Sequence, residues 1–381
     1  MEPPAGPAQM NRVGAATSAG RARLERLARP LAARLTRRWP PRSRLFLVGE
    51  GVGWSIDHDL AELARITHRL GITTADRRLL HASRHQAAFY GSHFTLLREP
   101  WRPPDHGLAT AYFHGRPGTP GMPEFDEAYR VLSAHHSEVD RLQVTHAEME
   151  DVVLSTGIDP AKVFRIPIGV DLPLFTPATA EARAAVRADL GIPGGAFVVG
   201  SFQKDGVGFG RGSEPKLVKG PDVLVAALRR VRARVPELHV MLTGIARGYM
   251  RDELDRLGIP WTHRYVARYE QIAPLYHALD VAVVSSRQEG GPKAVLESMA
   301  AGIPLVSTRV GQATDLVEDG VDGWLVDVED DEALADRIVA VAGGAASAEL
   351  LARARATAEA HAYHRQLPLW RDFFKRFVAI G

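Results

Sequence analysis

Two glutamates with seven residues between them, Glu289 and Glu297, stand beside a glycine turn in the second half of the chain. The turn leads into a predicted helix, whose first backbone N–H groups and positive dipole end favour an anion such as a phosphate. Two carboxylates that merely faced this anion would repel it. They suit the site if they accept hydrogen bonds from hydroxyl groups on either side of the anion, as on a sugar and a ribose.

A predicted strand and helix must position these glutamates. Residues 281–284 are an uninterrupted apolar run, mostly β-branched, which predicts a strand buried on both faces of a parallel sheet. A proline at its first position and a glycine followed by another proline at its end place the helix at about residues 292–301. Glu289 then lies in the loop before the helix, and Glu297 one to two turns into it.

The stretch SSRQEGGPKAVLESMAAGIPLVST resembles the signature of the family 4 glycosyltransferases, retaining enzymes of the GT-B fold. The resemblance implies that Glu289 holds hydroxyls of a donor sugar and that Glu297 holds the ribose of its nucleotide. The other donor-binding residues that it implies here are Gly290, Gly291, Pro292, Lys293 and Ala294. From the residues alone, an alternative stays open: Glu297 pairs with Lys293, four residues earlier on the helix, and Glu289 is a solvated loop residue.

A second informative stretch is Lys219-Gly220-Pro221-Asp222, which places a lysine just before another predicted helix. A cation beside a helix N-terminus suits a diphosphate. The stretch resembles the Lys-Gly phosphate site of the same family, which an arginine usually precedes shortly after a strand. That arginine is not obvious here, so Lys204 is the expected replacement and Lys216 the second choice. The alternative is a solvated basic loop.

The first half of the chain carries looser signals. His114 follows a strand predicted at residues 108–113, at the edge where open parallel sheets bind ligands. It resembles the family's strand-His-Gly, whose histidine faces the donor sugar and acceptor; the alternative is a loop histidine without a role. Gly51 and Gly53 follow a strand predicted at residues 45–48 and allow close approach of a phosphate or acceptor, although the G-x-G-x-x-G spacing is absent.

Smaller assignments concern a metal and the nucleotide base. Asp57 and Asp59 form a D-x-D pair, the metal-holding motif of the other large glycosyltransferase fold. They fall at a predicted helix start, where the dipole favours acidic side chains, so we expect no metal site. In the family, residues after the strand predicted here at residues 265–266 touch the base, which makes Tyr265 and Arg268 candidates.

Two positions depart from the family pattern. The passage VFRIPIGVDLPLFTP resembles the interdomain passage of the family, but Ile168 replaces the usual asparagine, so any hydrogen bond made by that asparagine is lost. The passage TRVGQATDLVEDGVDGWLV resembles the family's closing strand-turn-helix-turn-strand, with Gln312 where a second glycine is common.

Composition bounds the class of protein. At 381 residues and 45% hydrophobic content, the chain is long enough for two domains with cores of their own. The net charge of +2 is small, which argues against a nucleic-acid role. The absence of cysteine excludes disulfides and thiolate zinc sites and fits a reducing compartment. No apolar run approaches about 18 residues and no signal peptide is evident, so we expect a soluble cytoplasmic protein.

A basic segment precedes the first predicted strand. Residues 21–39 combine leucines at helical spacing with arginines, which predicts a basic amphipathic helix. Such a helix can lie on the anionic inner membrane surface as a peripheral contact, or it can pack on the first domain; both readings stay open.

The alternation of strands and helices predicts an α/β protein with two doubly wound, Rossmann-like domains that face each other across a cleft, the GT-B plan. Residues 73–98 are expected to be helical up to the apolar piece HFTLL. The predicted parts are a disordered or basic N-terminal extension (1–43), an acceptor-side domain (44–176), a nucleotide-sugar-binding domain (177–355), and a C-terminal helix that returns to the first domain (356–381).

The expected function is metal-independent transfer of a sugar from a nucleotide-diphosphate sugar to an acceptor hydroxyl, with retention of anomeric configuration implied by the resemblance. We expect no cofactor beyond this co-substrate, with Glu289, His114 and Lys219 as the catalytic candidates. The acceptor is a carbohydrate, a lipid or a small molecule. Three alternatives stay open: a sugar phosphorylase or synthase, a nucleotide-sugar 2-epimerase, and a non-catalytic nucleotide-sugar-binding subunit.

Overall fold

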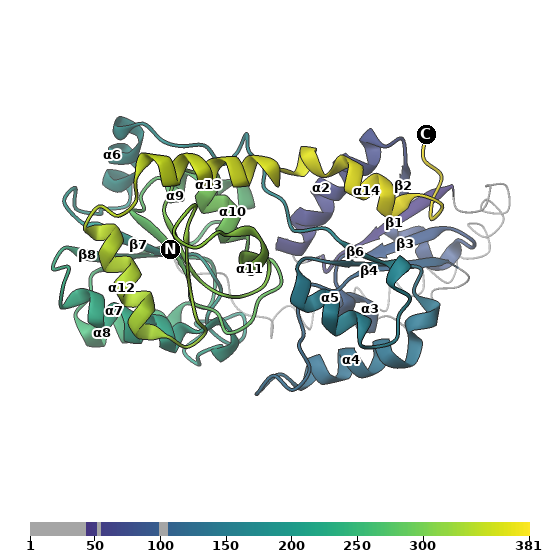
Figure 1. Ribbon diagram of the computed structural model, residues 1–381, viewed down its shortest axis with the longest axis horizontal. Helices are drawn as coiled ribbons and strands as arrows, with labels where there is room; N and C mark the ends of the chain where they lie inside the picture. Colours follow the sequence, from purple (N-terminus) through teal and green to yellow (C-terminus); the bar gives the residue numbers. More distant parts are fainter. Residues whose placement is uncertain (1–42, 52–54, 99–105) are drawn as a thin grey trace, which may run out of the picture. The chain divides into compact units, whose positions relative to one another are not determined.

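The computed structural model describes residues 43–51, 55–98 and 106–381. The chain forms two compact units (Figure 1). Of the described residues, the second unit contains Ile168–Ala362, and the first unit contains those from residue 43 to Pro167 together with Tyr363–Gly381. The basic segment at residues 21–39 and Gly53 lie outside the described residues. Among the helices that the structure describes, none is long and apolar enough to cross a membrane.

The first unit contains a six-stranded parallel sheet in the order β2-β1-β3-β4-β5-β6. Its strands are β1 (Arg44–Val48), β2 (Thr73–Ala75), β3 (Ala87–Tyr90), β4 (Gly107–Ala111), β5 (Arg141–Val144) and β6 (Val163–Arg165). Its helices are α2 (Ser55–Arg69), α3 (His93–Arg98), α4 (Pro123–His135), α5 (Ala147–Leu154) and α14 (Leu367–Phe374), with short 3-10 turns η1 (Arg77–Ala82), η2 (His136–Glu138), η3 (Pro160–Lys162) and η6 (Tyr363–Gln366). One apolar cluster joins the sheet to α2 and α14, and another joins it to α3, α4 and α5, so helices cover both faces.

The second unit repeats this plan with the strand order β12-β11-β10-β7-β8-β9. Its strands are β7 (Phe197–Ser201), β8 (Leu238–Thr243), β9 (Trp261–Arg264), β10 (Val281–Val284), β11 (Leu305–Thr308) and β12 (Trp324–Val326). Its helices are α6 (Ala180–Asp189), α7 (Pro221–Arg232), α8 (Gly248–Leu257), α9 (Ala273–Tyr276), α10 (Lys293–Ala300), α11 (Gln312–Leu316), α12 (Asp331–Ala342) and α13 (Ala348–Ala360), with η4 (Leu217–Lys219) and η5 (Tyr269–Ile272). The prediction of two doubly wound α/β domains is confirmed.

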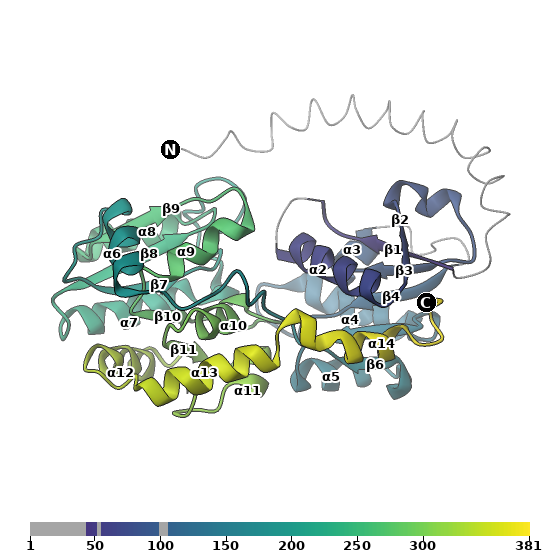
Figure 2. The same ribbon diagram turned by 90° about the horizontal axis from the view of Figure 1, so that it is seen from above.

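The end of the chain returns to the first unit, as predicted. Figure 2 shows α14 beside α2, and the two helices are in contact. The rings of Trp370 and Phe373 pack edge-on against Phe89 of β3, with centroids 5.8 and 5.7 Å away. The Tyr363 hydroxyl donates to Asp59 of α2 at 2.7 Å. Aromatic burial of this kind explains why the chain end is rich in Trp and Phe.

The units divide between Pro167 and Ile168 and between Ala362 and Tyr363. Packing explains both positions, because Val170 and Phe175 belong to a core cluster of the second unit, as do residues of α13. The divisions predicted after residues 176 and 355 therefore fall inside the second unit.

Two local expectations were wrong. Residues 73–98 contain two short strands, β2 and β3, where a helix was expected. Each of these strands is three or four residues long, so neither displays enough alternation to be distinguished by periodicity. The strand expected at residues 265–266 ends at Arg264 instead.

Candidate functional site

The strand order in the parallel sheet of the second unit reverses between the neighbouring strands β7 and β10. From β7 the sheet continues through β8 and β9 on one side, and through β10, β11 and β12 on the other. In open α/β sheets, ligands bind beyond the carboxyl ends of the strands at such a reversal. The loops that follow β7 and β10 carry Lys219 and Glu289, so the fold places both at this position.

Lys219 and Glu289 form an ion pair. The Lys219 ammonium lies 2.6 Å from Oε2 of Glu289, and Oε1 accepts a hydrogen bond from the Ser286 hydroxyl at 2.8 Å. The side chains are 23% and 11% exposed, so the pair is largely enclosed but reachable. The structure thus brings together two predicted site residues that are far apart in the sequence, with a cation and a hydroxyl-accepting carboxylate side by side.

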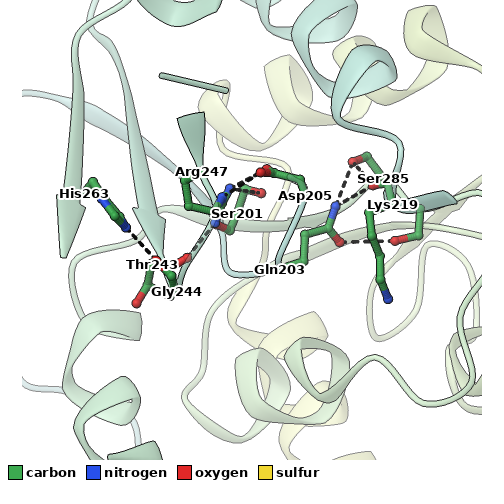
Figure 3. A network of polar contacts seen from close by, with 10 residues as sticks. Ser201, Gln203, Asp205, Lys219, Thr243, Gly244, Arg247, His263 and Ser285 are labelled. Carbon is green, nitrogen blue, oxygen red and sulfur yellow. Dashed lines mark hydrogen bonds and ion pairs between the residues drawn. The ribbon is translucent and has the colours of Figure 1, made fainter. Parts of the chain in front are cut away.

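A glycine makes the approach of these two loops possible. Gly220 adopts φ +60°, and a Cβ atom there would lie 1.9 Å from the carbonyl oxygen of Ser285. Only glycine allows this backbone contact. On the other side, the Gln203 side chain donates to the carbonyl oxygen of Lys219 at 2.7 Å and to the Ser285 hydroxyl at 3.3 Å (Figure 3). Gln203 was not predicted, and it ties the end of β7 to both loops.

Arg287 joins the same loops from the other end. Its guanidinium makes two hydrogen bonds to Asp222 at the start of α7, at 2.8 and 2.7 Å, and a third to Glu329 at 2.6 Å. Its backbone N–H donates to Val218 at 2.9 Å. Arg287 therefore fixes the segment before Lys219 against the segment before Glu289.

The Asp222 and Arg287 pair makes stability depend on pH. Burial works to raise the pKa of Asp222, but hydrogen bonds and charge from Arg287 outweigh it, so the pKa lies below its ordinary value. A depressed folded-state pKa adds stability that is complete above the unfolded pKa of about 3.9 and is lost as pH falls through the folded value. We expect wild type to be more stable than Asp222→Asn at pH 7, with a difference that shrinks from about pH 4 downward.

Urea unfolding of both proteins from pH 7 to pH 3 measures this difference. Asp336→Asn is the matched control, because Asp336 pairs with Arg234 at an exposed position where an ion pair contributes little. A difference between wild type and Asp222→Asn that stays constant with pH would show that the charge of Asp222 does not matter.

The turn before α10 is held by the segment that follows β11. Gly290 accepts a hydrogen bond from the Gln312 N–H at 2.9 Å, and a Cβ on Gly291 would lie 2.6 Å from Ile168 and 2.8 Å from Gln312. The Gln312 amide accepts from the Ile168 N–H at 2.8 Å and donates to the Ile168 carbonyl at 3.3 Å. The two positions that depart from the family pattern thus contact each other and support this turn.

The start of α10 differs slightly from the prediction. Pro292 is the residue before the helix, with ψ 108°, and Lys293 is the first helical residue. Ala294 packs against a core cluster, and Gly302 ends the helix region at φ +71°, as the sequence predicts. The Lys293 ammonium lies over the ring of Tyr269, 5.0 Å from its centroid.

Glu297 lies inside α10 and is only 5% exposed. Its Oε1 accepts a hydrogen bond from the Tyr269 hydroxyl, and its Oε2 accepts one from the Tyr276 hydroxyl at 2.7 Å. Burial raises the pKa of Tyr276 well above its ordinary value, and the neighbouring Glu297 raises it further. The phenol therefore keeps its proton and donates it to the Glu297 carboxylate in a hydrogen bond.

Lys204 and Lys216 lie at the base of one loop. The Lys216 N–H donates to Asp205 at 2.7 Å, and the Lys204 ammonium lies 4.3 Å from the centroid of the Phe209 ring. Burial lowers the pKa of Lys204, and the positive charge of Lys216 lowers it further. Two neighbouring cations of this kind favour an anion.

A buried arginine anchors this loop. Arg247 is 1% exposed; its guanidinium lies 2.8 Å from Asp205 and donates to the carbonyl oxygens of Ser201 and Thr243, each at 2.7 Å (Figure 3). The ends of β7 and β8 are thereby held together. Arg247 comes from the loop after β8, and the sequence does not signal its burial, because a lone arginine before a helix is usually exposed.

The two candidates for base recognition follow β9. Tyr265 is 42% exposed, and Arg268 precedes η5, where its N–H donates to the Gln271 side chain at 3.0 Å. Their contact with a base stays a prediction.

His114 and Gly51 belong to the first unit. The His114 ring follows β4 and packs against Phe94 and Phe125, with centroids 5.7 and 5.6 Å away. The neighbouring His93 ring stacks on the Tyr112 ring, with centroids 4.0 Å apart. Burial lowers the pKa of His93 well below its ordinary value, and the proximity of His114 lowers it further.

The glycine loop follows β1, where the strand order of the first unit reverses. Gly51 has φ +71°, and its N–H donates to Asp57 at 3.1 Å. Asp57 and Asp59 accept hydrogen bonds from within the protein, and no group of three or more His, Asp and Glu residues suited to a metal occurs in the part of the chain that the structure describes.

Comparison with known proteins identifies relatives of this chain. Residues 206–343, which include Lys219, Glu289 and Glu297, match the family described as Glycosyl transferases group 1. The chain is 32% identical over 205 residues to the D-inositol 3-phosphate glycosyltransferase of Corynebacterium urealyticum, covering 51% of this chain and 46% of that protein. It is 35% identical over 232 residues to the same-named protein of Xylanimonas cellulosilytica, covering 58% and 52%. The chain spans about half the length of these curated relatives.

Solved structures share the fold. Anabaena Alr3699/HepE, solved in complex with UDP and glucose, is 18% identical with a TM-score of 0.67, over 86% of this chain and 98% of that one. The sucrose-phosphate synthase of Thermosynechococcus elongatus is 18% identical with a TM-score of 0.66, over 88% and 99%. Residues 206–343 of the second unit therefore resemble the glycosyl transferases group 1, and the chain shares the two-domain α/β fold of these solved structures.

Proposed function

We propose that this chain is a glycosyltransferase that moves a sugar from a nucleoside-diphosphate sugar to an acceptor hydroxyl. The observation that carries the proposal is the pairing of Lys219 with Glu289 at the reversal of the strand order, beside the turn that opens α10. Relatives named as glycosyltransferases, and a neighbour solved with UDP and glucose, support the same activity.

The diphosphate of the donor would be held by charge and by backbone groups. The N–H groups at the start of α10 favour an anion, and Lys219 supplies a positive charge beside them. During transfer, negative charge builds up on the departing diphosphate, and a cation already fixed in place stabilises that charge without reorganisation. Lys204 and Lys216 would add to this effect.

The hydroxyls of the donor would be held by carboxylates. When the diphosphate engages Lys219, Glu289 becomes available to accept hydrogen bonds from the sugar, which positions the anomeric carbon for the acceptor. Glu297 would accept from the ribose. We propose retention of configuration because the resemblance to the retaining family 4 enzymes implies it, and we propose no requirement for a metal because Lys219 already offsets the leaving-group charge.

The acceptor side belongs to the first unit in this proposal, with His114 and the glycine loop at Gly51 as its candidate contacts. The acceptor is a carbohydrate, a lipid or a small molecule, and the reaction takes place in the cytoplasm. Attachment of the basic segment at residues 21–39 to an anionic membrane is part of the proposal; flotation with anionic but not with neutral vesicles would support it.

Thermal unfolding with UDP, GDP and ADP, and then with their sugars, tests the proposal. A nucleotide that binds only the folded chain at 100 times its dissociation constant adds about 2.7 kcal/mol of stability. We expect one nucleoside diphosphate to raise the melting temperature, and its sugar conjugate to be consumed only when an acceptor is added. Conversion of the nucleotide sugar without an acceptor would indicate an epimerase, phosphate-dependent glycoside cleavage would indicate a phosphorylase, and binding without consumption would indicate a non-catalytic subunit.

A further inference from the structure

Two tyrosines hold the carboxylate of Glu297 from different sides. Tyr276 is fully buried and donates to Oε2, while Tyr269 is half-buried and donates to Oε1. Their hydrogen bonds offset the cost of burying a carboxylate that is 5% exposed. Tyr276 thus belongs to the core, and Tyr269 is the partner of Glu297 on the more accessible side.

The carboxylate of Glu297 is the group that the proposed function assigns to the ribose hydroxyls. Each oxygen of an ionised carboxylate can accept about two hydrogen bonds. One tyrosine hydrogen bond to each oxygen therefore fixes the orientation of the carboxylate. A pair of neighbouring hydroxyls, such as the 2′- and 3′-hydroxyls of a ribose, matches the spacing of two carboxylate oxygens held in a fixed orientation.

Tyr269 is itself fixed by other contacts. The Lys293 ammonium lies over its ring at 5.0 Å, and the ring of Phe175 packs against it at 6.0 Å. A cation over the face of a phenol is attracted to it, and its field makes the hydroxyl a stronger donor. Because Lys293 opens α10 and Glu297 lies one turn further along it, Tyr269 bridges the anion-binding start of the helix and its buried carboxylate.

We propose that Tyr269 is a positioning residue that holds Glu297 for the ribose hydroxyls, and that it sets the preference of this site for ribonucleotides. The inference rests on the proposed function, since it concerns the nucleotide of the same donor. It assigns a role to a residue other than Tyr265 and Arg268, the candidates for contact with the base.

Calorimetric titration of wild type and Tyr269→Phe tests this role. The probes are whichever of UDP, GDP and ADP binds wild type most tightly, and the 2′,3′-dideoxy form of that nucleotide. We expect wild type to prefer the ribonucleotide by about tenfold or more, in line with hydrogen bonds to a charged group. In Tyr269→Phe the preference should fall to about threefold or less, through weaker ribonucleotide binding, while dideoxynucleotide binding is unchanged.

Two further variants separate positioning from folding. Tyr129→Phe removes a hydroxyl that contacts Ser155 at 3.0 Å in the first unit, and it should keep the wild-type preference. In a Glu297→Gln background, Tyr269→Phe should have no further effect on the preference, because both changes act through the same carboxylate. This cycle compares two nucleotides on each protein, so a loss of stability common to both cancels.

The outcomes are distinct. A Tyr269→Phe protein that keeps the full preference, or that loses affinity for both nucleotides equally, would overturn the inference and leave Tyr269 a structural residue. Equal binding of both nucleotides by wild type would also overturn it, without affecting sugar transfer. Failure of wild type to bind any nucleoside diphosphate would refute the proposed function itself, and it would be seen before any variant is made.

Discussion

A Glu289→Gln variant is expected to lose about 10²- to 10³-fold in the turnover number of sugar transfer while the fold stays intact. The amide keeps the shape of the side chain but removes the charge that accepts hydrogen bonds from the sugar. A sugar held less firmly spends less time in line with the acceptor. The nucleoside diphosphate itself should bind within about threefold of wild type, because its affinity depends on Lys219, the helix start and Glu297.

Steady-state kinetics with saturating nucleotide sugar, together with a melting curve, measures this effect. Glu332→Gln is the matched control, since Glu332 is an exposed residue of α12, away from the loops that carry the site. A turnover number within about threefold of wild type would contradict the assigned role of Glu289.

A Lys219→Met variant should lose about 10²- to 10³-fold in kcat/KM, because the variant lacks a fixed positive charge where the leaving diphosphate develops negative charge. Nucleotide binding should also depend on this positive charge. The dissociation constant of the nucleoside diphosphate should rise by about tenfold or more, whereas that of the nucleoside without phosphates should not change.

Titration of wild type and Lys219→Met with both ligands distinguishes charge from packing. Lys375→Met, at an exposed position of the first unit, should behave as wild type. Equal losses for the diphosphate and the nucleoside would mean that Lys219 shapes the loop instead of binding phosphate. Lys219 and Glu289 contact each other. The fold loss of sugar-transfer activity in the double variant, Lys219→Met with Glu289→Gln, should therefore be smaller than the product of the two single fold losses.

The strongest local signals predicted the second unit well. The apolar run at residues 281–284 is β10, and the proline and glycine that bound the next helix lie one residue before and two residues after α10. Lys219 and Glu289 were both expected near a phosphate, and strand order explains why they meet. Residues that follow neighbouring parallel strands at a reversal come together without any signal linking them in the sequence.

Tertiary contacts account for what could not be predicted. Arg247 and Gln203 act through Asp205 and Lys219, which are distant from them in the sequence, and the hydroxyls of Tyr269 and Tyr276 reach Glu297 from two short helices. Nothing in the spacing of these residues reveals such contacts. The short strands β2 and β3 were missed because sheet pairing, and not periodicity, stabilises segments of that length.

A crystal structure of the chain with a nucleoside diphosphate bound would test the central assignment most directly. The account predicts the diphosphate within hydrogen-bonding distance of the Lys219 ammonium and of backbone N–H groups at the start of α10, with the ribose on Glu297. A nucleotide bound elsewhere, with Lys219 still paired to Glu289, would contradict it.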